Sequence, residues 1–246
     1  MNRFLEAGTP VLVVSPHLDD AVLSCGAFLT AAAPRCPVTV ATVFTTAGPP
    51  PHTLAARRFL AGNDAQALYA ERRREDREVL SGLGCRVVHL GFPDALFRRR
   101  RSRLVLPELT HRYPTYRYDI ARGRVARGDR PLVDDIVAAL PADGGVVLCP
   151  LGVGRHVDHL LARAAAMRLP GHLVHYSDFP YDRTHPPDRD FISRNNLEPV
   201  SWTRQTARKA QLIRGYRTQV DGLFPDGVIP AVPEVYYSRT AFSTAR

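Results

Sequence analysis

Six residues of the types that bind metal ions or move protons fall into two short groups in this sequence. They are His17, Asp19, Asp20, His156, Asp158 and His159. His17 and Asp20 are three residues apart at an expected strand-to-helix turn, so both can face one point, and His159 can supply a third ligand from a neighbouring strand. Two imidazoles and one carboxylate leave a coordination position open for water. This arrangement is typical of a catalytic zinc site and not of a closed structural one.

The other three residues would surround this predicted zinc site. Asp19 lies beside the ligands and is free to accept the proton of a metal-bound water as a general base. His156 comes three residues before His159 on the same face of a helix start, where it can hydrogen-bond an oxyanion or protonate a leaving group. Asp158 is expected to orient one of the imidazoles by accepting a hydrogen bond from it.

The expected secondary structure explains how two groups so far apart in the sequence can meet. Apolar segments predict strands at 11–14, 37–45, 86–90, 144–149 and 172–177. Helices are expected from Asp19 through an Ala-rich segment, over 64–83, near 132–140, after His156 and over 206–220, with a last short strand at 235–237. Strands that alternate with helices at this spacing predict an α/β fold, Rossmann-like, with a mostly parallel sheet and helices on both faces.

Polar residues follow four of these expected strands. His17 follows the first strand, Asp94 the third, His156 the fourth and Asp178 the fifth. Ligands of an open α/β sheet bind beyond the carboxyl ends of its strands, so this pattern predicts one site at one edge of the sheet. One domain is expected over 1–246, with a lid or excursion at 92–130 and a tail at 181–246 that no motif covers.

The charge of the chain bears on its partners. Its 246 residues include 33 Lys and Arg against 24 Asp and Glu, a net charge of +9. Only Lys209 is a lysine, and such a preference for arginine beside abundant Ala and Pro is typical of a coding bias rather than of a phosphate-binding face. The cluster Arg98 to Arg101 is expected to be a solvated loop. A nucleic-acid partner is therefore not expected.

The cysteines and the apolar segments bear on the cellular compartment. The four cysteines form no CxxC pair and no dense framework, so we expect reduced thiols and neither a zinc knuckle nor a disulfide scaffold. The apolar run near the N-terminus is too short for a signal peptide, and no segment approaches the roughly 18 apolar residues that span a bilayer. We expect a cytoplasmic protein without membrane insertion, and the sequence leaves a homo-oligomer open.

At these residues the sequence resembles the PIG-L/LmbE-like family of zinc-dependent de-N-acetylases. The family motif Ala-His-Pro-Asp-Asp-Glu stands here as PHLDDA, residues 16–21, and its His-x-Asp-His motif stands as HVDH, residues 156–159. The resemblance implies that His17, Asp20 and His159 bind zinc, that Asp19 is the general base, and that His156 assists the oxyanion and the leaving amine. Two positions depart from the first motif, because Leu18 replaces its Pro and Ala21 replaces its Glu.

The resemblance also implies a substrate class, an N-acylated, most simply N-acetylated, amino sugar or glycoconjugate. An Arg-x-x-Glu that helps hold substrate in relatives resembles Arg72 to Glu75, and a Gly-x-x-Asp resembles Gly91 to Asp94. The expected substrate wall consists of Arg72, Asp94, Asp178, Tyr181 and Trp202. The variant SPHLDDAVLSCG, residues 15–26, is similar to relatives in antibiotic and other specialised sugar pathways.

Two other functions are compatible with the sequence. His17, Asp19 and His159 also match the HxD…H pattern of non-haem Fe(II) oxygenases, which are built on double-stranded β-helices. A non-catalytic, Arg-rich protein that binds nucleic acid is the second alternative, and its affinity would fall steeply with salt. The expected Ala-rich helices between strands argue against the first.

Overall fold

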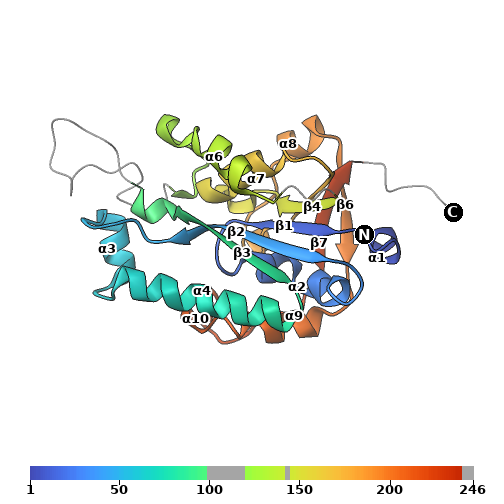
Figure 1. Cartoon of the computed structure of the whole chain (residues 1–246), viewed down its shortest axis with the longest axis horizontal. Helices are drawn as coiled ribbons and strands as arrows, with labels where there is room; N and C mark the ends of the chain where they lie inside the picture. The colour runs from blue at the N-terminus through green and yellow to red at the C-terminus, as the bar shows by residue number, and fades with distance from the viewer. Residues whose placement is uncertain (99–119, 142–144, 240–246) are drawn as a thin grey trace.

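The computed structural model describes residues 1–98, 120–141 and 145–239. Within them, seven strands form one sheet in the order β3-β2-β1-β4-β5-β7-β6 (Figure 1). The strands are β1 Val11–Ser15, β2 Val38–Thr46, β3 Arg86–Pro93, β4 Val146–Pro150, β5 His172–Tyr176, β6 Leu197–Trp202 and β7 Glu234–Arg239. The first five are parallel to one another, and β7 lies antiparallel between β5 and β6. The predicted α/β, Rossmann-like fold is confirmed.

Helices cover both faces of this sheet (Figure 1). One face carries α2 Asp20–Ala32, α4 Ala65–Gly82, α9 Thr206–Ile213 and α10 Arg217–Leu223. The other face carries α6 Leu132–Ala139, α7 Val157–Ala166 and α8 Arg189–Arg194. The remaining elements are α1 Asn2–Glu6, α3 Leu54–Leu60 and the 3-10 turns η1 Ala95–Phe97, η2 Arg127–Asp129, η3 Val153–Arg155 and η4 Tyr181–Arg183.

The central strand β1 shows why its sequence is apolar at successive positions. Val11 and Val13 pack into the core beneath α2 and α9, whereas Leu12 and Val14 pack against α6 and α7. A strand covered by helices on both faces buries every side chain, so it lacks the polar alternation of a half-exposed strand. All five residues of β1 are buried.

The C-terminal part departs most from the sequence expectations. The helix expected over 206–220 is two helices, because the chain turns at Gly215 to pack closely on α4, where a Cβ would lie 2.4 Å from Val79 Cγ2. Strand β6 was not expected, since it is an edge strand with Pro199 inside it and only its two end residues buried. Helices α1, α3 and α8 were not expected either.

The structure describes the expected lid region only in part. Of the expected lid or excursion at 92–130, residues 99–119 lie outside the described part of the chain, and with them Arg99 to Arg101 of the expected solvated loop.

No helix in the described ranges is both long and apolar enough to cross a membrane. All four cysteines are free and buried.

Candidate active site

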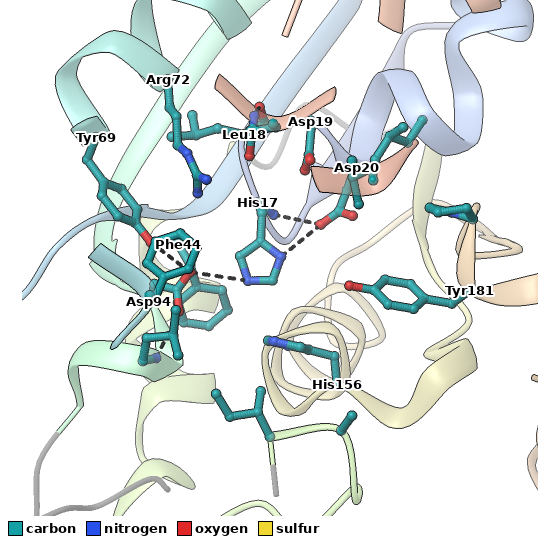
Figure 2. Close-up of a pocket in the computed structure, with 18 of the residues that line it drawn as sticks. His17, Leu18, Asp19, Asp20, Phe44, Tyr69, Arg72, Asp94, His156 and Tyr181 are labelled. Carbon is teal, nitrogen blue, oxygen red and sulfur yellow. Dashed lines mark hydrogen bonds and ion pairs between the residues drawn. The ribbon is translucent and has the colours of Figure 1, made fainter. Parts of the chain in front are cut away.

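The two motif segments leave neighbouring strands at the point where the chain reverses its order across the sheet. From β1 the chain continues to β2 and β3 on one side, while β4 and β5 lie on the other side of β1. Ligand sites of doubly wound sheets lie at such switch points. A cavity of about 780 Å³ opens there, and it is lined by residues of both motifs together with side chains from α3, α4 and α10 (Figure 2).

The turn between β1 and α2 is held by its own polar groups. The Ser15 hydroxyl donates to the His17 carbonyl at 2.8 Å and accepts the backbone N–H of Ala21 at 3.0 Å. Asp20 Oδ2 accepts the backbone N–H of His17 at 2.9 Å. These bonds join the strand end to the first turn of the helix, so the side chains of His17 and Asp20 point into the same cavity (Figure 2).

The three predicted metal ligands do converge. Asp20 Oδ2 lies 3.1 Å from His17 Nδ1 and 3.3 Å from His159 Nε2. His159 Nε2 is buried and makes no hydrogen bond in the described chain. Burial opposes a charge on both rings, but Asp158 and Asp20 raise the pKa of His17 well above its usual value, and mainly Asp20 raises that of His159 to about 10. The site therefore attracts positive charge, as a divalent cation requires.

Other groupings of potential ligand atoms share these residues. The ring nitrogens of His17, His156 and His159 lie within 4.8 Å of one another, and so do ligand atoms of His17, Asp94 and Asp158. His156 is the N-cap of α7, and its Nδ1 accepts the backbone N–H of Asp158 at 3.2 Å. Burial and the nearby His17 hold the pKa of His156 well below its usual value. A neutral His156 therefore carries its proton on Nε2 and is a hydrogen-bond donor there.

Asp19 differs from its neighbour Asp20 because its carboxylate makes no hydrogen bond within the described part of the chain. It is the N-cap residue of α2, but its side chain makes no capping hydrogen bond, and the side chain is buried with 8% exposure. Burial, followed by the charge of Asp20, raises the pKa of Asp19 to about 7. A carboxylate with a pKa near the working pH is suited to take up and return a proton.

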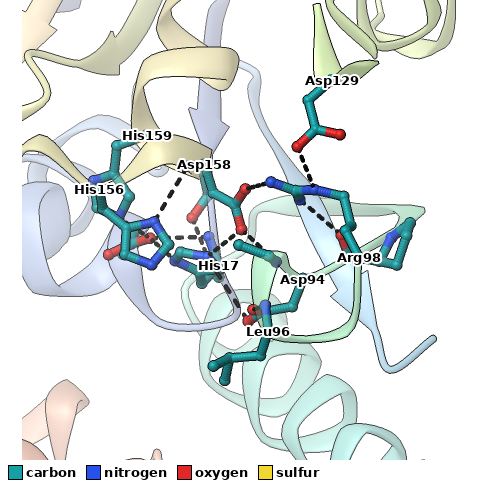
Figure 3. Close-up of polar contacts among 12 residues, drawn as sticks. His17, Asp94, Leu96, Arg98, Asp129, His156, Asp158 and His159 are labelled. Carbon is teal, nitrogen blue, oxygen red and sulfur yellow. Dashed lines mark hydrogen bonds and ion pairs between the residues drawn. The ribbon is translucent and has the colours of Figure 1, made fainter. Parts of the chain in front are cut away.

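Asp158 contacts the opposite ring nitrogen of His17 from Asp20, and Figure 3 shows it beside His17. Its Oδ2 is 3.2 Å from His17 Nε2 and accepts the backbone N–H of Ala95 at 3.0 Å. Its Oδ1 accepts Arg98 Nη2 at 2.5 Å. Arg98 was expected in a solvated loop, and that expectation is wrong, because Arg98 is only 4% exposed and pairs with two buried carboxylates.

Three of the five expected substrate-wall residues line the cavity, namely Arg72, Asp94 and Tyr181. Asp94 Oδ2 lies 3.9 Å from His17 Nε2 and accepts the Tyr69 hydroxyl at 2.8 Å. The ring of Tyr181 lies 5.8 Å from that of His159. It packs on Gly154, where φ is +77° and a Cβ would lie 3.1 Å from Tyr181.

The other two expected wall residues lie elsewhere. Asp178 is buried, with one oxygen 2.6 Å from His159 Nδ1 and the other accepting the backbone N–H groups of Gly152 and Val153 at 2.7 Å each. Its carboxylate therefore orients His159 and does not reach the cavity. Trp202 is 4% exposed and packs edge-on against Phe28, 5.4 Å between ring centroids. It belongs to the core beneath α2 and α9.

Sequence reasoning also missed residues that line or support the cavity. Tyr69 lies on α4 one turn before Arg72, and this three-residue spacing was a usable signal. Gln219 and Leu223 reach the cavity from α10. That helix is attached to α4 because Glu75 accepts the backbone N–H of Thr218 at 3.1 Å and its hydroxyl at 2.7 Å. Such a contact across 143 residues has no signal in the sequence.

The fold and these side chains define a Rossmann-like α/β protein with a candidate metal centre beyond β1 and β4. The sequence pattern of the PIG-L family, described as GlcNAc-PI de-N-acetylase, matches residues 12–169, and the chain belongs to this family. The expected family membership is confirmed.

Two curated relatives carry the name 2'-N-acetylparomamine deacetylase. The one from Streptomyces fradiae is 33% identical over 178 residues, which cover 69% of this chain and 57% of the relative. The one from Niallia circulans is 27% identical over 243 residues, covering 87% and 82%. The chain thus spans less than two thirds of the length of the Streptomyces fradiae protein.

Solved structures with the same fold include two antibiotic deacetylases. The deacetylase of the teicoplanin biosynthesis pathway has a TM-score of 0.70 and 25% identity, with 96% of this chain and all of that chain covered. The A40926 pseudoaglycone deacetylase has a TM-score of 0.65 and 27% identity, with 97% of this chain and all of that chain covered.

Proposed function

We propose that this protein is a zinc-dependent hydrolase that removes an N-acyl group, most simply acetyl, from an amino sugar or glycoconjugate in antibiotic biosynthesis. The observation that carries this proposal is the pairing of two kinds of carboxylate. Asp20 lies between two imidazoles as a ligand would, while Asp19 next to it has no hydrogen-bond partner in the described chain and a pKa near 7. The names of the relatives support the reaction and the pathway.

His17, Asp20 and His159 would hold the zinc ion. His159 fits this role because Asp178 takes the proton of Nδ1, so the lone pair of Nε2 faces Asp20. His17 would offer Nδ1, since its Nε2–H is directed at Asp158. When bound, zinc would polarise the amide carbonyl and lower the pKa of a coordinated water toward neutrality, from about 9 for the aqueous ion.

Asp19 acts as the general base in this mechanism. It accepts a proton from the attacking water as the C–O bond forms at the amide carbon. The C–N bond breaks when the amide nitrogen receives a proton, which Asp19 returns, and the products are an amine and a carboxylic acid, which releases its proton to solvent as the carboxylate. A pKa near 7 favours both the uptake and the return of this proton.

His156 stabilises the oxyanion that forms on the carbonyl oxygen. Its Nδ1 is occupied by the backbone N–H of Asp158, which directs the Nε2–H away from the helix. Figure 2 shows His156 beside His17 at the cavity, and the two rings lie edge to face with their centroids 4.9 Å apart. A fixed neutral donor at this place binds the developing charge without reorganising.

The sugar would lie against the α4 side of the cavity. Asp94 can accept hydrogen bonds from sugar hydroxyls, and Tyr69 holds its carboxylate in place. Arg72 lies at the same wall, its guanidinium 5.6 Å from the centre of the Tyr69 ring, with Nε buried and without a hydrogen bond in the described chain. These groups would therefore contact the hydroxyl groups of the sugar and not the acyl group that is removed.

The two alternative functions lose their basis in the fold. The non-haem Fe(II) oxygenases that share the HxD…H pattern are built on double-stranded β-helices, whereas this sheet is mostly parallel and covered by helices on both faces (Figure 1). A nucleic-acid-binding protein would need exposed arginines, but Arg98, the first of the arginine cluster, is buried and paired with Asp158 and Asp129. A small N-acylated sugar is the better partner.

The test is a screen for released amine with fluorescamine over a panel of N-acetylated amino sugars, aminoglycosides and glycopeptides. The protein is assayed as purified, after removal of metal with a chelator, and after addition of zinc or another divalent ion. We expect turnover that disappears with the metal and returns with zinc. Amide hydrolysis that a chelator leaves untouched would refute the metal mechanism, and no amine from any substrate would refute the reaction.

A further inference from the structure

Arg98 occupies an unusual place for an arginine, because it is enclosed at the end of the β3–η1 segment. Its side chain is 3% exposed, and each of its three guanidinium nitrogens has a protein partner. Nε donates to Asp129 Oδ2 at 3.1 Å, Nη2 to Asp158 Oδ1 at 2.5 Å and Nη1 to the Pro93 carbonyl at 3.0 Å. The guanidinium also lies 5.0 Å from the centre of the Phe44 ring.

The partner that matters for the site is Asp158. Figure 3 shows its carboxylate between His17 on one side and Arg98 on the other. Oδ2 contacts His17 Nε2 and also accepts the backbone N–H of Ala95, the residue after Asp94. One carboxylate therefore touches a predicted metal ligand and the backbone of the substrate wall at the same oxygen.

We infer that Arg98 is a positioning residue for this site. By holding Asp158 and the Pro93 carbonyl at once, its guanidinium fixes the ring of His17 relative to the Asp94 turn. This inference rests on the proposed function, because it concerns the residues that would bind the metal and the sugar.

The chemistry of guanidinium explains why an arginine is needed here. Its planar, fork-shaped set of donors can reach two carboxylates and a carbonyl in fixed directions, which an ammonium group on a flexible chain cannot do. Two buried carboxylates around one buried cation are stable only while all three are present, since removal of one leaves an unpaired buried charge. Without Arg98, Asp158 Oδ1 would lose the hydrogen bond from Nη2 of Arg98, and the carboxylate could rotate away from His17.

The test compares metal binding by four metal-stripped, full-length proteins: wild type, Arg98→Met, Arg98→Lys and Arg73→Met. Arg73 is the matched control, because Nη1 of this arginine on α4 donates to the Thr45 carbonyl at 2.8 Å and the side chain does not line the cavity. Dissociation constants for Co²⁺ and Zn²⁺ are measured by competition with a chromogenic chelator. The visible absorption of bound Co²⁺ reports the geometry of the ligands, and circular dichroism reports folding.

We expect Arg98→Met to weaken metal binding by about 10- to 100-fold, the usual effect of losing a group that orients a ligand, and to change the Co²⁺ spectrum. Arg98→Lys should lie between wild type and Arg98→Met, and the KM for the substrate should rise in both. Arg73→Met should keep the wild-type spectrum and bind metal within about threefold of wild type. Wild-type affinity and spectrum in Arg98→Met would overturn the inference.

A double-mutant cycle with Asp158→Asn tests the route of the effect. If Arg98 acts through Asp158, the double variant Arg98→Met with Asp158→Asn binds Co²⁺ about as weakly as the worse single variant. Losses that multiply would overturn the inference, and if Arg98→Met does not fold, the same cycle with Arg98→Lys decides. A wild-type protein that binds Co²⁺ but hydrolyses no substrate would refute the proposed function. The Co²⁺ affinities and spectra would still test whether Arg98 positions the metal ligands.

Discussion

Asp178 Oδ1 lies 2.6 Å from Nδ1 of His159, and this contact determines that Nε2 is the ring nitrogen that faces Asp20. The other Asp178 oxygen is held by the backbone N–H groups of Gly152 and Val153, so the carboxylate cannot turn away. Histidine ligands of metal sites commonly donate their second ring N–H to a carboxylate, which makes the ligating nitrogen more basic. Asp178, expected in the substrate wall, is therefore part of the support of His159.

Replacing this carboxylate should affect metal binding before substrate binding. In Asp178→Asn the amide can donate to Nδ1, which would place the ring proton on Nε2 and remove the lone pair needed for a ligand. We expect the zinc dissociation constant to rise by about 10- to 100-fold and activity to return at high zinc. A variant with normal zinc content but a raised KM would restore Asp178 to the substrate wall.

Asp19 and Asp20 should separate clearly in their effects. Asp19→Asn removes the general base and should lower kcat by about 100- to 10,000-fold while zinc stays bound. Asp20→Asn and His159→Ala should instead lose the metal, which plasma emission spectroscopy of the dialysed protein can measure. If Asp19→Asn is purified without zinc, Asp19 is a ligand and its assignment as base is wrong.

His156 should matter for turnover more than for metal content. Removing one donor to an oxyanion typically lowers kcat by about 100- to 1,000-fold, so His156→Ala should show a loss of this size with KM little changed. His156→Gln, which keeps an N–H group, should recover part of it. Loss of zinc in both variants would favour the grouping in which His156 joins His17 and His159 as a ligand.

The positions of the motif residues could be predicted because they depend on strand ends. His17 comes two residues after β1 and His159 lies in the first turn of α7, the helix that follows β4, and the carboxyl ends of neighbouring parallel strands meet at one edge of the sheet. The partners of these residues depend on contacts between distant segments. Arg98 meets Asp158 across 60 residues, and its run of arginines resembles an exposed loop when read locally.

Trp202, which was expected in the substrate wall, also could not be located from the sequence. Trp202 is the last residue of β6, an edge strand that could not be predicted because its middle residues are exposed. The strand directs the Trp202 ring onto Phe28 of α2. A lone aromatic near the end of a chain has no periodic pattern that shows which side it faces. Tyr181, expected in the substrate wall, does line the cavity, since it follows β5, and the end of that strand was predicted within one residue.

A buried histidine outside the active site should make the fold sensitive to acid. His175 in β5 is 1% exposed, with Nδ1 3.2 Å from the Cys149 sulfur. Burial lowers the pKa of His175 from 6.5 to about 4. Between these two values the unfolded chain binds a proton that the folded chain does not, so the free energy of unfolding falls as the pH falls through this range.

Replacing His175 by Gln removes this dependence and provides the measurement. The full difference in pKa corresponds to about 3 kcal/mol of stability, present above pH 6.5 and lost by pH 4. Urea unfolding of the metal-stripped wild type and of His175→Gln, at several pH values in this range, avoids a contribution from metal release. The stability advantage of the wild type should shrink or reverse as the pH falls. A wild-type-to-variant difference that is the same at pH 7 and pH 4 would show that His175 is protonated in the folded protein, because only then do both states bind the same proton.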